Sequence, residues 1–387
     1  RHLVPSNIVA DSNVWATSIG KTGVQAITGG AYYINTKTEV ITQYGSGIAG
    51  GLSSRYANSL ALSKNGKVYV ASAQSLTGTT TLQGGVYVSS TLNPPAPSST
   101  SFTNAIPSDA GDINYYSAAN RGDELWFGKA ASIVRLSGAG ALIGTITSSN
   151  SPLPLSASTF ARAIFTDTIT GNTDTGLNRG GVSVCKPDGT WKLLTSSNSA
   201  FPAGGAVNFN AISAVYGEIW VGTTAGIFVY DGTSSLDSVS SFKLLTTANG
   251  LPTNSITDIA VDTARSHIWI TSGSGVSRAS YVPPYIKGIL YNVYCKNPAT
   301  TEDTLQLYEN LQKKPIIANA TIKLFEGAVA KDSANVNQYG VFELKKAEEG
   351  KTYTVEIKYK TDSGSITYKY LNVKNHTLMG AILIPDS

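Results

Sequence analysis

The sequence predicts an all-β protein in which a β-propeller of repeated four-stranded units is followed by a smaller β-sandwich domain. Three observations predict this class. Apolar and polar residues alternate with a period of two through most of the chain, which is the pattern of half-buried strands. A similar unit recurs through residues 1–282 with a period of about 40–50 residues, which is typical of propeller blades. Charged residues then become more frequent after the pair Pro283-Pro284.

The composition of the 387 residues indicates a folded chain. Charged residues make up 14% and apolar residues 41%, which excludes a disordered protein. The net charge of +4 is scattered, so we expect no nucleic-acid partner. No apolar run reaches the ~18 residues of a membrane span. No signal segment is visible, so either a leader was removed or this is a fragment, and both fit a secreted or cell-surface location.

Asn254–Arg278 is the clearest repeat unit, and the unit that precedes it runs from Ala211 to Gly250. The four predicted strands of the preceding unit are Ala211–Val215, Ile219–Thr223, Gly226–Tyr230 and Phe242–Thr246. The clearest unit has the strands Ile256–Asp262 and His267–Thr271, then Gly275-Val276. A single four-stranded sheet is a poor core, so stacked neighbours must bury both of its faces.

Upstream copies bring the count to six units. Second strands are predicted at Val14–Thr17, Val68–Ala71 and Leu125–Gly128, with a degenerate copy at Ala163–Thr166. Third strands are predicted at Gly29–Tyr32, Gly84–Tyr87, Ala131–Val134 and Gly180–Ser183. Fourth strands are predicted at Glu39–Tyr44, Leu142–Thr147 and Thr190–Thr195. The Trp or Tyr of each second strand is expected to pack between blades, and the glycines to allow close backbone approach. No clear fourth strand follows Arg278. Six blades are therefore favoured, and seven remain an alternative.

The last two units carry a family resemblance. Asn249–Ile256, with Asp262 and Ile268-Trp269-Ile270, resembles the repeat of two-component-regulator propellers. These are periplasmic or extracellular sensor and binding modules. The resemblance implies blades but no particular function.

A second domain is predicted at residues 283–387, after a propeller at 1–282. It holds 24 charged residues in the 103 that follow Pro284, against 30 in the 284 before. Lys314–Phe325, Asn337–Leu344 and Glu349–Ile357 alternate in polarity and are separated by glycine turns. This pattern resembles the carboxypeptidase-regulatory-like or Cna-B-like domains of the prealbumin type, which implies an immunoglobulin-like β-sandwich.

Some Cna-B-like domains form an internal Lys–Asn bond with the help of a buried acid. The nearest candidates that the resemblance offers here are Lys287, Glu356 and Asn372. The alternative is that all three side chains face the solvent.

Motifs of common catalytic sites are missing from the sequence. It contains no GxSxG elbow, no P-loop and no strand–GxGxxG–helix segment, and its three histidines lack metal-ligand spacing. We therefore predict no catalytic residue and no cofactor other than calcium. Asp11, Asp167 and Asp262 end or follow strands and could gather at a central mouth, as in a glycosidase, but turn chemistry is the simpler interpretation.

One loop is rich in oxygen ligands. Within residues 167–176, Asp167, Asn172 and Asp174 could contribute to a calcium site, although their spacing is not that of an EF-hand. Elsewhere, Tyr32, Tyr87 and Tyr230 are candidates for exposed strand positions. A disulfide between Cys185 and Cys295 is possible, but their spacing gives no argument for it.

These observations favour a non-enzymatic extracellular binding or structural protein, acting in adhesion or in the assembly of a surface array or filament. Its partner would be a protein or glycan at the cell surface, or another copy of the chain. Two alternatives stay open. One is a polysaccharide-acting propeller enzyme, either a lyase or a glycoside hydrolase, and the other is a sensor ectodomain.

Overall fold

The structure is a computed structural model of the chain. It describes residues 2–5, 14–19, 29–45, 51–63, 66–77, 80–90, 101–107, 114–215, 217–233, 236–237, 242–262, 267–280, 285–295, 311–316, 319–361, 364–375 and 377–385. The described residues form antiparallel sheets almost throughout, with one short 3₁₀ helix at Thr247–Asn249. The all-β class is therefore confirmed. No helix among the described residues is long and apolar enough to cross a membrane.

The chain divides into two compact units. The first holds most of the chain up to Arg278, and the second holds Ala279–Ser387 together with two short segments from the turns of the preceding sheets. Each unit has its own core, and each is described separately below.

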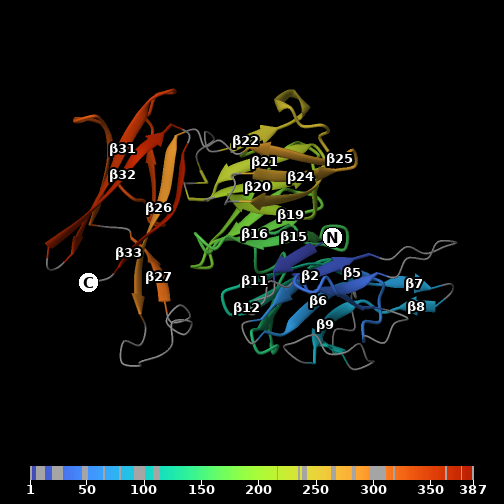
Figure 1. Cartoon of the computed structure of the whole chain (residues 1–387). Coiled ribbons are helices and arrows are strands. Elements are labelled where there is room, and N and C mark those ends of the chain that lie inside the picture. The colour runs from blue at the N-terminus through green and yellow to red at the C-terminus, as the bar shows by residue number, and fades with distance from the viewer. Residues whose placement is uncertain are drawn as a thin grey trace. The chain divides into compact units, whose positions relative to one another are not determined.

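Strands of the first unit form sheets in chain order (Figure 1). The first two sheets are β1 (His2–Pro5), β2 (Val14–Ser18), β3 (Gly30–Ile34), β4 (Ile41–Tyr44), then β5 (Tyr56–Leu62), β6 (Val68–Ala73), β9 (Gly85–Ser89), β10 (Phe102–Asn104), with a separate hairpin β7 (Ser75–Thr77), β8 (Thr80–Leu82). The next two are β11 (Tyr115–Arg121), β12 (Glu124–Lys129), β13 (Ile133–Ser137), β14 (Leu142–Ile146), then β15 (Ala161–Thr166), β16 (Thr173–Leu177), β17 (Val182–Cys185), β18 (Trp191–Leu194). The last two are β19 (Val207–Val215), β20 (Glu218–Thr223), β21 (Gly226–Asp231), β22 (Phe242–Leu245), then β23 (Ile256–Asp262), β24 (His267–Ser272), β25 (Gly275–Ser280).

The core of this unit lies between consecutive sheets. Alternation along β6 shows the principle, because Val68 and Val70 pack against the first sheet while Tyr69 and Ala71 pack against the third. Two more apolar clusters fill the spaces between the third and fourth sheets and between the fourth and fifth. The second, third and fourth sheets therefore bury both faces, as the repeat predicted, and the arrangement is propeller-like.

Hydrogen bonds join the first strands of neighbouring sheets. Asn58 Nδ2 donates to the Tyr115 carbonyl at 2.7 Å, and Ser117 Oγ donates to the Ala161 carbonyl at 2.9 Å. The same pattern continues with Arg162 to Val207 and Asn208 to Ile256. We call β5, β11, β15, β19 and β23 the inner strands, because this chain of contacts links them.

Two glycines show why the third strands begin with small residues. A Cβ on Gly30 would overlap the Tyr44 carbonyl oxygen, and a Cβ on Gly181 would overlap that of Leu194. Their φ angles of +152° and +111° also disfavour any other residue. The predicted third strands of the first four sheets, and the predicted fourth strands of the first, third and fourth, agree with the structure, whereas β10 of the second sheet was not predicted.

One strand prediction was wrong. Ala163–Thr166 was expected to be a degenerate second strand, but it belongs to β15, the inner strand of its sheet. The true second strand is β16, which contains no aromatic residue and buries Thr173, Asp174 and Thr175. Phe165 resembles the aromatic residue of the other second strands, which is why Ala163–Thr166 was expected to be one of them.

Gly176 gives a first prediction about how the sheets pack. A Cβ there would lie 2.9 Å from the Val207 Cβ of the next sheet, so Gly176→Ala should lower the free energy of unfolding by about 1–3 kcal/mol through overpacking. Gly273→Ala is the control, because nothing lies within 4 Å of its added Cβ. All five tryptophans precede Arg278, so tryptophan fluorescence during urea unfolding reports this unit alone. Equal midpoints for the two variants would contradict the prediction.

The second unit contains two four-stranded sheets. One consists of β27 (Leu311–Pro315), β26 (Ile286–Cys295), β30 (Val341–Leu344) and β33 (Leu378–Pro385), which pairs with β26 in parallel. The other consists of β29 (Val329–Ala334), β28 (Ala320–Glu326), β31 (Thr352–Thr361) and β32 (Gly364–Lys374). Leu290 and Phe342 of the first sheet share a core with Ile322 and Val355 of the second.

Candidate functional site

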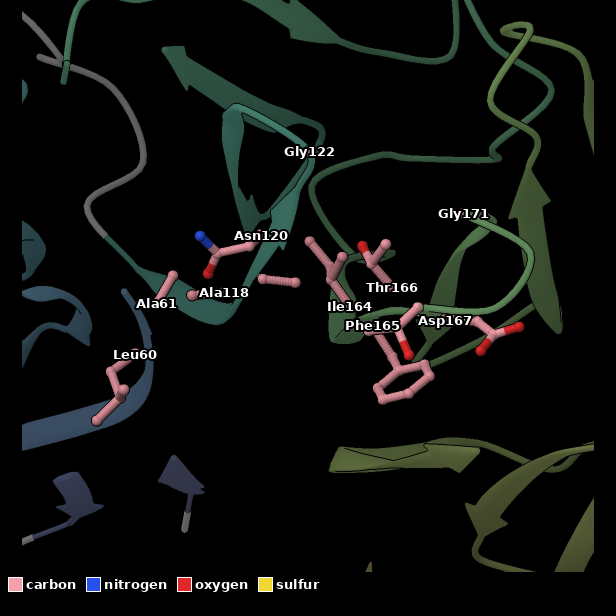
Figure 2. A pocket seen from close by; sticks show the side chains of 12 residues that line it. Leu60, Ala61, Ala118, Asn120, Gly122, Ile164, Phe165, Thr166, Asp167 and Gly171 are labelled. Atoms are coloured by element: carbon pink, nitrogen blue, oxygen red, sulfur yellow. The ribbon is translucent and has the colours of Figure 1, made fainter. Parts of the chain in front are cut away.

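A pocket of about 570 Å³ lies where three inner strands end (Figure 2). β5, β11 and β15 supply most of its wall, and the β11–β12 and β15–β16 turns supply the rest. Its lining is Leu60, Ala61, Ala118, Ala119, Asn120, Gly122, Ile164, Phe165, Thr166, Asp167, Thr168 and Gly171. The volume is within the range of small-molecule sites, about 300–1,000 Å³. The small side chains on β5 and β11 leave the space open.

Polar groups of the pocket are few and are held in place by hydrogen bonds within and between sheets. Asn120 Nδ2 donates to the Leu62 carbonyl, which ties β11 to β5. The Thr166 and Thr173 hydroxyl groups lie 3.1 Å apart in a hydrogen bond across the β15–β16 hairpin. In Figure 2, Asn120 lies across the pocket from Ile164 and Thr166. The site is thus an apolar cavity with a few oriented polar groups, the usual character of a ligand pocket.

Asp167 lines the pocket but serves its own turn. Its Oδ1 accepts a hydrogen bond from the Ile169 amide at 3.1 Å. Its Oδ2 accepts from the Thr170 amide at 3.2 Å and the Thr170 hydroxyl at 2.7 Å. The carboxylate points away from Leu60 and Asn120 in Figure 2. This is the turn chemistry that the sequence offered as the simpler interpretation. Of the other two acids considered with it, Asp11 and the side chain of Asp262 lie outside the described residues.

Asn172 and Asp174 project from one face of the β15–β16 hairpin toward the next sheet. Both are almost fully buried. Asn172 Nδ2 donates to the Gly232 carbonyl at 3.5 Å, and the Tyr230 hydroxyl donates to Asp174 Oδ1. The other side-chain oxygens, Asn172 Oδ1 and Asp174 Oδ2, have no hydrogen-bond partner among the residues that the structure describes.

Burial raises the pKa values of Asp174 and of its partner Tyr230. Removal from water raises the pKa of Asp174 to about 8, the hydrogen bond from Tyr230 opposes that rise, and the charge of Asp167 adds to it. Burial, followed by the charge of Asp174, raises the pKa of Tyr230 well above 10. The structure thus brings Asn172 and Asp174 together and directs Asp167 into its own turn. Among the described residues, no three His, Cys, Asp or Glu side chains form a group that could hold a metal. Calcium binding at Asp167, Asn172 and Asp174 stays a prediction.

Three tyrosines were expected to be exposed on strands, and the structure corrects this. Tyr230 and Tyr87 are buried, because their sheets are covered on both faces, and Tyr32 is half-buried. Cys185 is a buried free thiol, and the side chain of Cys295 lies outside the described residues.

Neither interpretation of Lys287, Glu356 and Asn372 holds: the three do not form one group, and Lys287 does not face the solvent. Lys287 lies on β26 and is buried, whereas Glu356 and Asn372 lie on β31 and β32 of the other sheet. The carboxylate beside Lys287 is that of Glu343, at 3.4 Å, and Glu356 pairs with Lys369.

Sequence reasoning missed a second group of residues, at the opposite ends of the inner strands. The β5–β6, β11–β12 and β15–β16 pairings each skip one residue: Asn58, Tyr116 and Arg162. Each is therefore a β-bulge at the equivalent place in three consecutive sheets. An alignment of the three inner strands would have revealed this common position, in Ala57-Asn58-Ser59, Tyr115-Tyr116-Ser117 and Ala161-Arg162-Ala163. That alignment requires Ala161–Thr166 to be recognised as an inner strand.

Comparison with known proteins gives a likeness in fold. No family model and no curated protein matches the chain. Among solved structures, it is similar to the extracellular domains of two hybrid two-component systems from B. thetaiotaomicron. The first has a TM-score of 0.52 and 13% identity over 100% of this chain, and the second has 0.50 and 14% over 98%. The chain spans half the length of each of these structures.

Proposed function

We propose that this chain is a ligand-binding part of an extracellular or periplasmic sensor module. The likeness to extracellular domains of two-component systems supports this alternative over the adhesion or filament role that the composition favoured. The resemblance of the repeat around Asn249–Ile256 to regulator propellers points the same way.

The proposed architecture is a six-bladed propeller at residues 1–282 and an immunoglobulin-like sandwich at 283–387. Five sheets of four strands and one of three, in the described part of the first unit, support the blade count. The two sheets that share one core in the second unit support the sandwich.

The observation that carries the proposal is the pocket at the ends of β5, β11 and β15. Three rigid strands position its wall, and the turn after β15 forms part of its mouth. A ligand that binds there would contact three consecutive sheets and the turn that joins β15 to β16. Binding could therefore alter how these sheets pack, which is what a sensor requires.

Blocking the mouth tests this proposal. Thr168 is exposed in the β15–β16 turn and lines the pocket, so Thr168→Trp should fill the opening without disturbing the core. The purified chain would be screened by tryptophan-monitored thermal unfolding with monosaccharides, oligosaccharides, amino acids and short peptides. A ligand present at about 100 times its Kd should stabilise the chain by about 2.7 kcal/mol. Thr168→Trp should abolish that gain.

Thr145→Trp is the matched control, because Thr145 is exposed on β14, the outermost strand of its sheet. A ligand that stabilises both variants equally would place the binding site elsewhere. If no compound stabilises the chain and it assembles into ordered filaments on concentration, the assembly role would replace the sensor role.

A further inference from the structure

The bulges at the beginning of the inner strands place side chains at one end of the first unit, away from the pocket described above. A β-bulge bends its strand and re-aims one side chain, and bulges are frequent beside binding sites. Asn58, Tyr116 and Arg162 occupy the equivalent position in consecutive sheets yet differ in size and charge. Their neighbours Ser59, Ser117 and Ala163 are uniformly small and buried. The residue type therefore differs among the three bulge positions, whereas the buried positions that follow them all carry small residues.

Aromatic rings surround Arg162. Its guanidinium carbon lies 4.9 Å from the ring centre of Phe209 and 5.6 Å from that of Phe160. Phe160 stacks on Tyr116 with centroids 4.2 Å apart, and Tyr116 lies 6.2 Å from Phe209. All four side chains are half-buried. The rings hold the cation in place and exclude part of its water.

The charge of Arg162 has no carboxylate partner among the described residues. Its only hydrogen bond there goes from Nη1 to the Val207 carbonyl at 3.4 Å, and its buried Nε has no acceptor. Arg135 shows the contrast, because its Nε and Nη2 both donate to Glu124, at 2.8 and 2.6 Å. Burial lowers the pKa of Arg162 from its usual value. A partly dehydrated guanidinium with unused donors is suited to bind an anion.

A second cavity adjoins this group. It measures about 350 Å³ and is lined by Asn208, Phe209, Thr257, Asp258 and Thr271, so it shares Phe209 with the ring cluster. Burial raises the pKa of Asp258 to about 6, so its carboxyl group is largely ionised at neutral pH. That acid would repel a second negative charge on a ligand. Arg162 attracts one negative charge and Asp258 repels a second, so the two together favour a ligand with a single negative charge.

We propose that Arg162 binds the carboxylate of a small organic monoanion, whose apolar body packs against Phe209 and Tyr116 and extends into the cavity beside Asp258. The planar guanidinium fork matches a carboxylate, and a single arginine does not balance the charge of a phosphate dianion. This site lies at the opposite ends of the inner strands from the Thr168 pocket and does not depend on the sensor role.

Benzoate and its neutral isostere benzamide are the probes, titrated into the whole purified chain by calorimetry. Benzoate should bind with a Kd on the order of millimolar, and benzamide at least about tenfold more weakly. Terephthalate, a dianion, should also bind more weakly than benzoate. Equal affinities for benzoate and benzamide in the unmodified chain, or no benzoate binding at all, would refute the proposal without any variant.

Variants then assign the site. Arg162→Gln should lower benzoate affinity at least about tenfold, and Arg162→Lys should lower it less because it keeps the charge but loses the fork. Arg179→Gln is the control, since Arg179 is exposed in the turn before β17. Tryptophan-monitored melting checks that each variant is folded. Benzoate binding that survives Arg162→Gln in a folded chain, or that Thr168→Trp abolishes, would also overturn the assignment.

Discussion

Asp174→Asn is expected to remove most of a steep loss of stability that the first unit shows as the pH rises from about 4 to about 8, and to leave the smaller loss between about pH 4 and 6 that the raised pKa of buried Asp258 causes. The carboxyl group is fully buried, and its pKa rises from 3.8 in the unfolded chain to about 8 in the folded one. The folded chain therefore holds a proton that the unfolded chain releases in this window. The free energy of unfolding should fall by up to ~1.4 kcal/mol per pH unit, with the contribution complete below pH 3.8 and lost above pH 8.

The measurement is urea unfolding followed by tryptophan fluorescence between pH 4.5 and pH 8.5, with a chelator present. Asp174→Asn should match the unmodified chain at the acid end and exceed it in stability at the alkaline end, because asparagine never ionises. Asp188→Asn removes an exposed acid from the β17–β18 turn of the same sheet and should leave the steep slope in place. Parallel pH profiles for the unmodified chain and Asp174→Asn would contradict the expectation.

The same titration with calcium tests the metal prediction. A cation held by Asp167, Asn172 and Asp174 would favour the ionised carboxylates, so it should raise stability more at pH 8 than at pH 5. Asp174→Asn should then abolish the gain. A calcium effect that is absent, or that persists in this variant, would eliminate the predicted site.

Glu343→Gln should destabilise the second unit by about 3 kcal/mol. Lys287 is buried on β26, and its ammonium lies 3.4 Å from Glu343 Oε1 across the β26–β30 pairing. Tyr285 Oη also donates to that oxygen, at 2.8 Å. Glutamine keeps the shape and an acceptor for Tyr285 but removes the charge. An uncompensated buried cation usually costs about 3–5 kcal/mol, whereas replacing both partners costs little.

The double variant Lys287→Met/Glu343→Gln should therefore recover most of the loss. Lys345 also pairs with Glu343, at 3.4 Å, but is largely exposed, so Lys345→Gln should change stability little. Hydrogen exchange of the β26 and β30 amides gives the readout for this unit, which contains no tryptophan. If the double variant is as unstable as Glu343→Gln, the uncompensated charge is not the cause.

Much of the fold could be predicted because its signals are local. Alternation of period two located strands such as Leu125–Gly128, and glycines marked the third strands at Gly30 and Gly181. Both signals depend only on residues within one strand and its turn. The assignment failed at Ala163–Thr166, where β16 lacks the usual aromatic residue and Phe165 imitates it.

The sites were much less predictable. Turn chemistry at Asp167 could be anticipated, because its partner Thr170 is only three residues away. The partner of Asn172, the Gly232 carbonyl, lies 60 residues away and could not be predicted. Arg162 gave no signal, because its rings come from three separate stretches and a bulge aims it toward them.

The amino-acid order by itself determined the strand-rich class, the repeated four-stranded units and the change in composition near Pro283. Only the tertiary structure decided that Tyr230 and Asp174 meet in a dry interior, that Lys287 faces Glu343, and that Arg162 lies over Phe209. The physical reason is that alternation defines two faces for every strand. Whether a face meets water, another sheet or a cavity depends on neighbours that are distant in the chain.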